Sequence, residues 1–281
     1  MTSLHTVPDI TLNNDVLIPQ VGLGVFQVPD GKTQEVVEHA LELGYRHVDT
    51  AAAYRNEEGV GAAVRASALP REELFITTKL RNGDQGHDST LKAFDASRRA
   101  LGLDVVDLYL IHWPRPDLDL YVETWRALEK LYAEGAVHAI GVSNFLPEHL
   151  ERLVAESDIV PAVNQVELHP TFQQPATLEA TRRAGVAVEA YSPLGQGRDL
   201  ESPAVTEVAA AHGVTPAQVV LRWHVQQGTI VIPKSVNPRR MVENIDLFGF
   251  ELSDEEMAAV AGLDSDDRIG ADPATFSYSQ Y

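Results

Sequence analysis

Eight short apolar segments recur along the chain, and most are followed by a polar stretch long enough to form a helix. The segments are apolar nearly throughout, which is typical of parallel strands buried on both faces. Glycine accepts the left-handed conformation that ends a helix, and it punctuates these joins at Gly44, Gly102, Gly135, Gly185, Gly213 and Gly228. Alternation of strands and helices in a chain of 281 residues predicts an α/β fold, the (β/α)8 TIM barrel. The predicted strands lie within residues 18–26, 45–51, 73–80, 105–113, 136–145, 161–168, 185–194 and 229–235.

The stretches between the strands carry helical patterns. In residues 33–43 the apolar positions share one helical face, at Val36, Val37, Ala40 and Leu41. We expect further helices at 89–101, 120–134 and 175–184. Ahead of the first strand, an Asn-Asn-Asp turn within residues 9–19 predicts a β-hairpin that closes the bottom of the barrel. No linker or shift in composition interrupts the sequence, so we expect residues 1–281 to form a single domain.

A doubly wound nucleotide-binding sheet is the competing architecture. It requires a G-x-G-x-x-G motif between the first strand and the first helix. Residues 22–27 read GLGVFQ, with Gln27 in place of the third glycine. None of the eight tyrosines is followed by a lysine four residues later, which removes the other common reductase signature. The barrel is therefore the stronger prediction.

Charge and composition narrow the classes of partner. The chain has a net charge of −19, which argues against nucleic acid or an anionic membrane as a partner and requires a local basic pocket for any anionic ligand. It has no cysteine, so disulfides and thiolate metal sites are impossible. We find neither a signal peptide nor an apolar run of membrane-spanning length. We expect a cytoplasmic monomer that acts on a small molecule, without a metal.

Polar side chains end seven consecutive predicted strands, and four of them fall on three neighbouring strands. Asp49 ends the second strand, and Tyr54 follows it. Lys79 ends the third strand and His112 the fourth. Catalytic groups of such barrels lie at the carboxyl ends of the strands, so we expect these four side chains to converge. Solvation of the barrel rim would explain any one of them but explains the group poorly.

The four side chains suggest proton donation to an oxygen atom. An unperturbed tyrosine has a pKa near ~10, and a neighbouring ammonium lowers that pKa by stabilising the phenolate. We therefore expect Asp49 to keep Lys79 charged and Lys79 to make Tyr54 acidic. His112 would hydrogen-bond and orient the substrate oxygen. Protonating a carbonyl oxygen is half of a carbonyl reduction, and the other half is a hydride that a nicotinamide cofactor must supply.

Three motifs in order make the chain resemble the aldo-keto reductases. They are GYRHVDTAAAYRNEEGVG at 44–61, IGVSNF at 140–145 and IPKSVNPRRMVENI at 232–245. The resemblance covers essentially the whole chain, is most marked to the bacterial 2,5-diketogluconic acid reductase branch, and is specific because three separate motifs agree. One departure is His138, where the family usually carries Lys, Arg, Glu or Gln. We expect little consequence, because His138 begins its strand, away from the predicted site.

The resemblance implies the same catalytic tetrad, Asp49, Tyr54, Lys79 and His112, with Tyr54 as the proton donor. It also implies that Tyr191 stacks on the nicotinamide ring. Ser143, Asn144 and Gln165 would hydrogen-bond its carboxamide. The resemblance also implies that the loop after the seventh strand wraps the pyrophosphate of the cofactor. Its implied contacts are Ser192, Leu194, Gly195 and Gln196.

The third motif indicates NADPH rather than NADH. Lys234, Arg239 and Arg240 crowd into seven residues of a very acidic protein. Asn237 and Pro238 read as the start of a helix, whose backbone N–H groups attract phosphate. The resemblance places a 2′-phosphate on Lys234, Ser235 and Arg240, with Val236 in the same segment, and the adenine near Glu243 and Asn244.

The substrate is defined less sharply. Phe26, Tyr54, His112 and Trp113 supply the predicted substrate contacts, and the tail ATFSYSQY either closes the pocket or is disordered. An aldehyde or ketone is expected: a small dicarbonyl, a keto sugar acid or an aromatic aldehyde. Three alternatives remain open at this point. They are a cofactor-binding regulatory or structural protein, a glycosidase that uses Asp49 and Glu167, and a metal enzyme.

Overall fold

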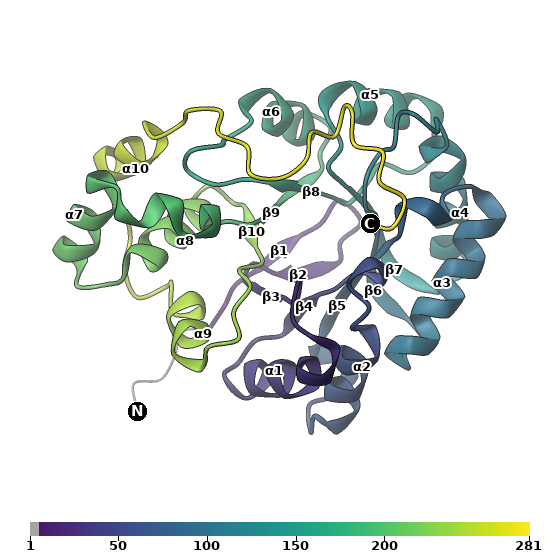
Figure 1. Cartoon of the computed structure of the whole chain (residues 1–281), viewed down its shortest axis with the longest axis horizontal. Coiled ribbons are helices and arrows are strands. Elements are labelled where there is room, and N and C mark those ends of the chain that lie inside the picture. The colour runs from purple at the N-terminus through teal and green to yellow at the C-terminus, as the bar shows by residue number, and fades with distance from the viewer. Residues whose placement is uncertain (1–5) are drawn as a thin grey trace.

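The computed structural model describes residues 6–281, and its central feature is a barrel of eight parallel strands (Figure 1). Neighbouring strands pair in sequence order, and bridges between Val21 and Val231 and between Gly24 and Lys234 join the last strand to the first. The predicted TIM barrel is therefore confirmed. Its strands are β3 (Gly22–Gly24), β4 (His47–Asp49), β5 (Phe75–Leu80), β6 (Val106–Ile111), β7 (Val137–Ser143), β8 (Val163–Glu167), β9 (Ala187–Tyr191) and β10 (Ile230–Val231).

Helices surround the barrel (Figure 1). The four helices predicted from periodicity are present with ends shifted by three residues or fewer, and six glycines that follow helices have positive φ, as expected. Within residues 6–281, no helix is both long and apolar enough to cross a bilayer. The helices are α1 (Asp30–Glu42), α2 (Glu57–Ala66), α3 (His87–Leu101), α4 (Tyr121–Ala133), α5 (Pro147–Glu156), α6 (Pro175–Arg183), α7 (Pro203–His212), α8 (Pro216–Gln226), α9 (Pro238–Ile245) and α10 (Asp254–Ala261).

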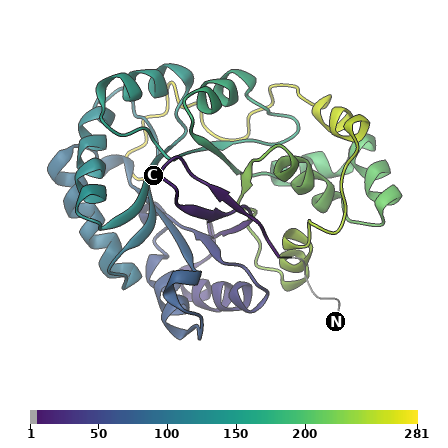
Figure 2. The same cartoon turned by 180° about the vertical axis from the view of Figure 1, so that it is seen from behind.

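The predicted hairpin closes the amino-terminal end of the barrel. Strands β1 (Asp9–Thr11) and β2 (Leu17–Pro19) pair antiparallel and lie across that end, as seen from behind in Figure 2. Leu12 and Ile18 are buried with Leu108, Val163 and Ile230 in the lower barrel interior. Because apolar side chains fill this end, the polar interior groups are left at the carboxyl end, where the loops leave the strands.

Candidate active site

Lys79 is the centre of a polar chain at the carboxyl end of the barrel. Its Nζ donates to Asp49 Oδ1 at 2.6 Å and to the Thr50 carbonyl at 2.9 Å. It also lies 3.4 Å from the hydroxyl of Tyr54. Asp49 ends β4, Lys79 lies near the end of β5, and Tyr54 ends the short 3₁₀ helix η1 (Ala52–Tyr54). The Lys79 side chain is 0% exposed, and a buried ammonium persists only when it is paired, as here with Asp49.

The structure corrects the expected acidity of Tyr54. Burial, followed by the negative charge of Asp49, raises the pKa of Tyr54 well above its usual value. Lys79 does not reverse this effect, because its charge is largely offset by the carboxylate of Asp49. Burial also raises the pKa of Asp49, against the opposing effect of Lys79. Tyr54 is thus a phenol that holds its proton until a stronger base reaches it.

His112 directly follows β6 and lies beside Tyr54, with the two ring centroids 5.7 Å apart. Burial, and then the charge of Lys79, hold the pKa of His112 well below its usual range, so the imidazole is neutral at physiological pH. Its Nδ1 has no hydrogen-bond partner among residues 6–281. A neutral imidazole can donate one hydrogen bond to an oxygen atom without competing with Tyr54 for a proton.

Gln165 on β8 connects this chain to a buried acid that sequence reasoning missed. Its Nε2 donates to Asp49 Oδ2 at 2.8 Å and to Glu189 Oε2 at 2.9 Å. Both amide hydrogens are therefore used, and the side-chain carbonyl oxygen Oε1 of Gln165 is the group still available to a ligand. Glu189 is 0% exposed and lies 3.6 Å from His47 Nε2. Its signal in the sequence was a single carboxylate in the middle of an apolar strand.

Ser143, Asn144 and Tyr191 line the same cavity. Ser143 and Tyr191 end β7 and β9, the strands on either side of β8, and Asn144 directly follows Ser143. The Tyr191 hydroxyl donates to Asn144 Oδ1 at 2.9 Å. Asn144 Nδ2 in turn donates to the backbone carbonyl of His112 at 3.0 Å, and Ser143 Oγ donates to the backbone carbonyl of Gln165 at 2.8 Å. These contacts fix the orientation of each side chain, including that of the aromatic ring of Tyr191.

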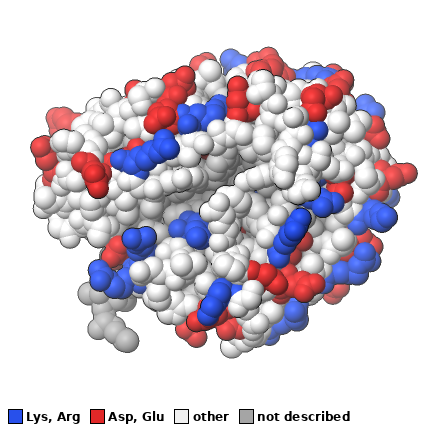
Figure 3. All heavy atoms as spheres, viewed as in Figure 1, with Lys and Arg blue, Asp and Glu red and all other residues white. Residues whose placement is uncertain are grey.

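The basic segment after β10 leads into a capped helix start and could hold an anion. Asn237 caps α9 as predicted, since its side chain accepts from the backbone N–H groups of Arg239 and Arg240. Ser235 is buried and accepts from the Asn237 N–H at 3.1 Å. The charged ends of Lys234 and Arg240 have no ion-pair partner among the described residues. Figure 3 shows a face with a central hollow and Lys and Arg atoms beside it, over α9.

The other side chains expected at the cofactor lie around this segment. Glu243 pairs with Arg239 at 3.9 Å. Asn244 is buried, whereas Val236 is 52% exposed. Of this segment Lys234 lines the cavity, and two unpaired cations beside a capped helix start could hold an anionic group such as a phosphate in a chain of net charge −19.

The segment after β9 is tied down by a buried histidine. Ser192 and Leu194 precede the 3₁₀ segment η4 (Gly195–Glu201), which Gly195 and Gln196 begin, and positive φ values occur at three of these four positions. Asp199 of η4 lies 3.4 Å from His169 Nδ1, and Glu167 lies 3.1 Å from His169 Nε2. Burial alone would lower the pKa of His169, but Asp199 and Glu167 raise it to about 9. A buried imidazolium therefore holds η4 against the end of β8.

The carboxyl-terminal segment is ordered and covers one side of the cavity. Of the two expectations for the tail, closing the pocket or disorder, the first is confirmed. It crosses the face of the barrel in Figure 1, and the N–H groups of Ile269 and Gly270 donate to Glu167 at 2.6 and 2.7 Å. Further along, the Gly83 N–H donates to the Ser279 carbonyl at 2.9 Å, and the Asn82 N–H donates to the Tyr281 carbonyl. Glu167 is thus committed to structure, which removes the pair of acids that a glycosidase would need.

The resulting cavity has a volume of about 370 Å³. Phe26 and Trp113 line it as predicted, together with Tyr54 and His112. The tail adds two rings: Phe276 lies 4.3 Å from Trp113 and Tyr281 lies 5.5 Å from His112, between ring centroids. Asp49, Tyr54 and His112 therefore meet the predicted aromatic walls in one cavity, and Lys79 is buried beside Asp49 and Tyr54.

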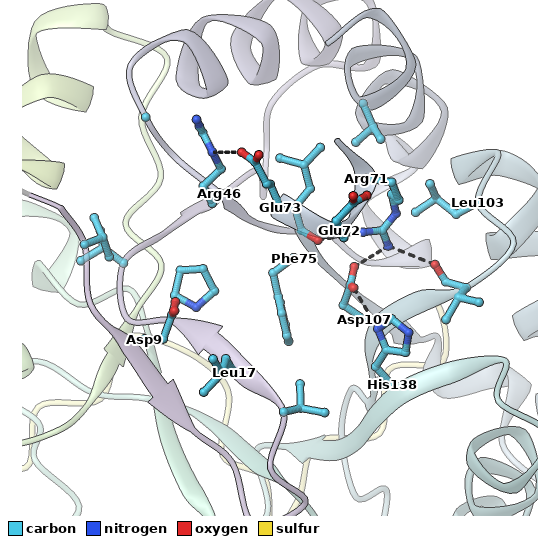
Figure 4. A pocket seen from close by; sticks show the side chains of 18 of the residues that line it. Asp9, Leu17, Arg46, Arg71, Glu72, Glu73, Phe75, Leu103, Asp107 and His138 are labelled. Carbon is cyan, nitrogen blue, oxygen red and sulfur yellow. Dashed lines mark hydrogen bonds and ion pairs between the residues drawn. The ribbon is translucent and has the colours of Figure 1, made fainter. Parts of the chain in front are cut away.

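A larger hollow of about 1140 Å³ opens at the other end of the barrel, beside the hairpin. Figure 4 shows ion pairs among its charged side chains: Arg46 with Glu73, and Arg71 and His138 with Asp107. His138, the departure from the family pattern, therefore lies far from Tyr54, at the opposite end of the strands. These contacts hold the starts of the strands together.

Comparison with known proteins agrees with this geometry. Residues 20–203 and 198–265 match the Aldo/keto reductase family. An aldo-keto reductase of Mycolicibacterium smegmatis is 54% identical over 272 residues, which cover 97% of this chain and 99% of that protein. The glyoxal reductase of Bacillus subtilis is 49% identical, over 94% of this chain and 95% of its own length.

Solved structures match along the same length. The apo structure of Gox0644 superimposes with a TM-score of 0.94 at 50% identity and covers 98% of this chain and 100% of its own. A Gox0644 mutant in complex with NADPH gives the same TM-score at 49% identity, with the same coverage. An aldo-keto reductase of Bombyx mori in complex with NADP has a TM-score of 0.88 at 37% identity, covering 95% and 96% of the two chains. The chain therefore belongs to the aldo/keto reductase family.

Proposed function

We propose that this protein is an NADPH-dependent oxidoreductase that reduces aldehydes or ketones to alcohols, with Tyr54 as the proton donor. The observation that carries the proposal is the chain Asp49–Lys79–Tyr54, with links of 2.6 and 3.4 Å, in which Asp49 and Tyr54 line the cavity. Relatives with related activities support it, since glyoxal reductase and morphine 6-dehydrogenase are among them. They act on different compounds, so the 2,5-diketogluconic acid reductase branch stays a prediction.

The proposed roles follow from the geometry. The nicotinamide, when bound, supplies the hydride. His112 donates a hydrogen bond to the carbonyl oxygen and orients it toward Tyr54. As that oxygen becomes more basic it takes the proton of Tyr54, and Lys79 stabilises the phenolate through its ammonium. Asp49 keeps Lys79 charged throughout. The raised pKa of Tyr54 fits this order, because the proton leaves only when a developing alkoxide is present.

For the cofactor, we propose that Tyr191 stacks on the nicotinamide ring. Ser143, Asn144 and the free carbonyl oxygen of Gln165 bind its carboxamide. The unpaired cations Lys234 and Arg240 are placed to bind a 2′-phosphate, which supports NADPH over NADH. The further proposed contacts are Ser192, Leu194, Gly195 and Gln196 for the pyrophosphate, Ser235 and Val236 for the phosphate segment, and Glu243 and Asn244 for the adenine.

The test combines binding and turnover. Quenching of protein fluorescence by NADPH and NADH measures the two affinities, and a panel of aldehydes and ketones is then screened with the tighter cofactor. NADPH binding with turnover supports the proposal. Tight binding without turnover of any carbonyl supports the regulatory alternative instead. We also propose a single-domain cytoplasmic monomer, which gel filtration tests for the oligomeric state.

A further inference from the structure

The part of the cavity that faces the tail is lined by six aromatic side chains, and we call it the substrate chamber. Centroid distances from Tyr54 are 5.0 Å to Phe26 and 5.7 Å to His112. The rings of the tail complete the wall opposite. The chamber consists of Phe26, Tyr54, His112, Trp113, Phe276 and Tyr281. Flat apolar walls of this kind bury an aryl or other flat apolar group.

The positive charges of Lys79 and Arg115, close to the chamber, are both paired with carboxylates. Lys79 is buried and spends its hydrogen bonds on Asp49, Thr50 and Tyr54. Arg115 forms a two-pronged ion pair with Asp117, with distances of 2.7 and 2.8 Å. Among the described residues that line the cavity, Lys234 is the only lysine or arginine, and it stands on the proposed cofactor side.

The polar groups that remain for a substrate are neutral. Tyr54 keeps its proton, and His112 is uncharged because burial holds its pKa well below the usual range. The indole Nε1 of Trp113 is buried and has no hydrogen-bond partner within residues 6–281. These groups can serve a carbonyl oxygen and one further neutral acceptor. A carboxylate in the chamber would lose its water without gaining a counter-ion, and the acidic side chains Asp49 and Glu167 line the same cavity.

We propose that the substrate chamber selects uncharged carbonyl compounds bearing an aromatic or flat apolar group, and rejects those that carry a carboxylate. The inference rests on the proposed function and deepens it. Of the three substrate classes considered from the sequence, it favours the aromatic aldehyde and disfavours the keto sugar acid.

The test uses a pair of substrates that differ in charge and hardly in shape, 4-formylbenzamide and 4-formylbenzoate, with benzaldehyde as reference. With NADPH, we expect kcat/KM for the amide to exceed that for the carboxylate by at least about 100-fold. Equal values would overturn the inference while leaving the proposed function intact. If none of the three is reduced, the proposed function itself fails and the inference falls with it.

Two controls separate the chamber from the long-range field of the acidic protein. The ratio of kcat/KM for the amide to that for the carboxylate is measured at low and high salt, because salt screens distant charge repulsion but hardly affects a buried group. A ratio that collapses toward one in high salt would contradict a role for the chamber. Phe276→Arg adds a cation beside Trp113, and Phe276→Leu removes the same ring without charge. We expect the arginine variant alone to shift the preference toward the carboxylate by ~10-fold or more; identical ratios in the two variants would refute the charge argument.

Discussion

Glu189→Gln should remove a pH-dependent loss of stability from the protein. Glu189 lies wholly inside the barrel, where it accepts from Gln165 and faces His47, Asp49 and Lys79. Burial, followed by the charge of Asp49, raises the pKa of Glu189 from the usual 4.5 to about 8. At neutral pH the neutral acid therefore accompanies one ion pair, Asp49 with Lys79, and the interior carries no net charge.

The size and sign of the effect follow from proton linkage. In the unfolded chain Glu189 loses its proton near pH 4.5, whereas in the folded protein it keeps it up to about pH 8. The stability that this group contributes is complete below about pH 4.5 and is lost as the pH rises through 8. Each pKa unit corresponds to about 1.4 kcal/mol, so the whole loss is up to about 5 kcal/mol.

The assay is urea unfolding of the wild type and Glu189→Gln at intervals from pH 5 to pH 9. Glutamine does not titrate, so we expect the free energy of unfolding of the variant to rise relative to the wild type from pH 5 to about pH 8, by several kcal/mol in total, and the difference to level off above pH 8. His169 also loses its proton in this range, but it is present in both proteins and cancels. Glu207→Gln, at an exposed position of α7, controls for the substitution. A constant difference between wild type and Glu189→Gln would refute the reasoning.

Three further predictions concern the proposed cofactor site, the buried histidine and the packing of the helices. Arg240→Ala should weaken the binding of NADPH by ~10- to 100-fold and the binding of NADH hardly at all, as measured by fluorescence quenching. Equal loss of affinity for the two cofactors would show that Arg240 does not bind the phosphate. His169→Gln should lower the free energy of unfolding in urea by about 3–5 kcal/mol near neutral pH, because it leaves two buried carboxylates without their cation. This loss should shrink as the pH rises through about 9, where the imidazolium of the wild type loses its proton. A loss that does not depend on pH would contradict a charged His169. Gly61→Ala should destabilise the protein by about 1–3 kcal/mol, because its Cβ would lie 2.0 Å from the Leu101 carbonyl oxygen. Gly31→Ala, in open space on α1, should be neutral or stabilising, and equal effects at the two glycines would contradict the packing.

The barrel was predictable because its signals are local and repeated. Each apolar run followed by a helix and a glycine carries the same information, and one misjudged helix end changes nothing. The convergence of Asp49, Tyr54, Lys79 and His112 followed directly, because parallel strands present their carboxyl ends at one edge. The sequence alone therefore predicts which four side chains converge at the site.

The remaining features depend on contacts between distant segments, and no local pattern encodes them. Glu189 looked like one acid in an apolar strand, and its partners come from three other strands. The tail lacks periodicity because the hydrogen bonds that hold it come from Glu167 and the loop after β5, and its rings pack on Trp113 and His112. The acidity of Tyr54 was misjudged because the sequence gives neither the depth of its burial nor how fully Asp49 offsets Lys79.

The most direct test of the account is the reduction of benzaldehyde by Tyr54→Phe, with NADPH binding to the same preparation measured by fluorescence quenching. We expect kcat to fall by ~100- to 10,000-fold, because the phenol proton is lost, while the Kd for NADPH stays within about threefold of the wild type. Turnover near the wild-type rate would contradict the assignment of Tyr54 as the proton donor.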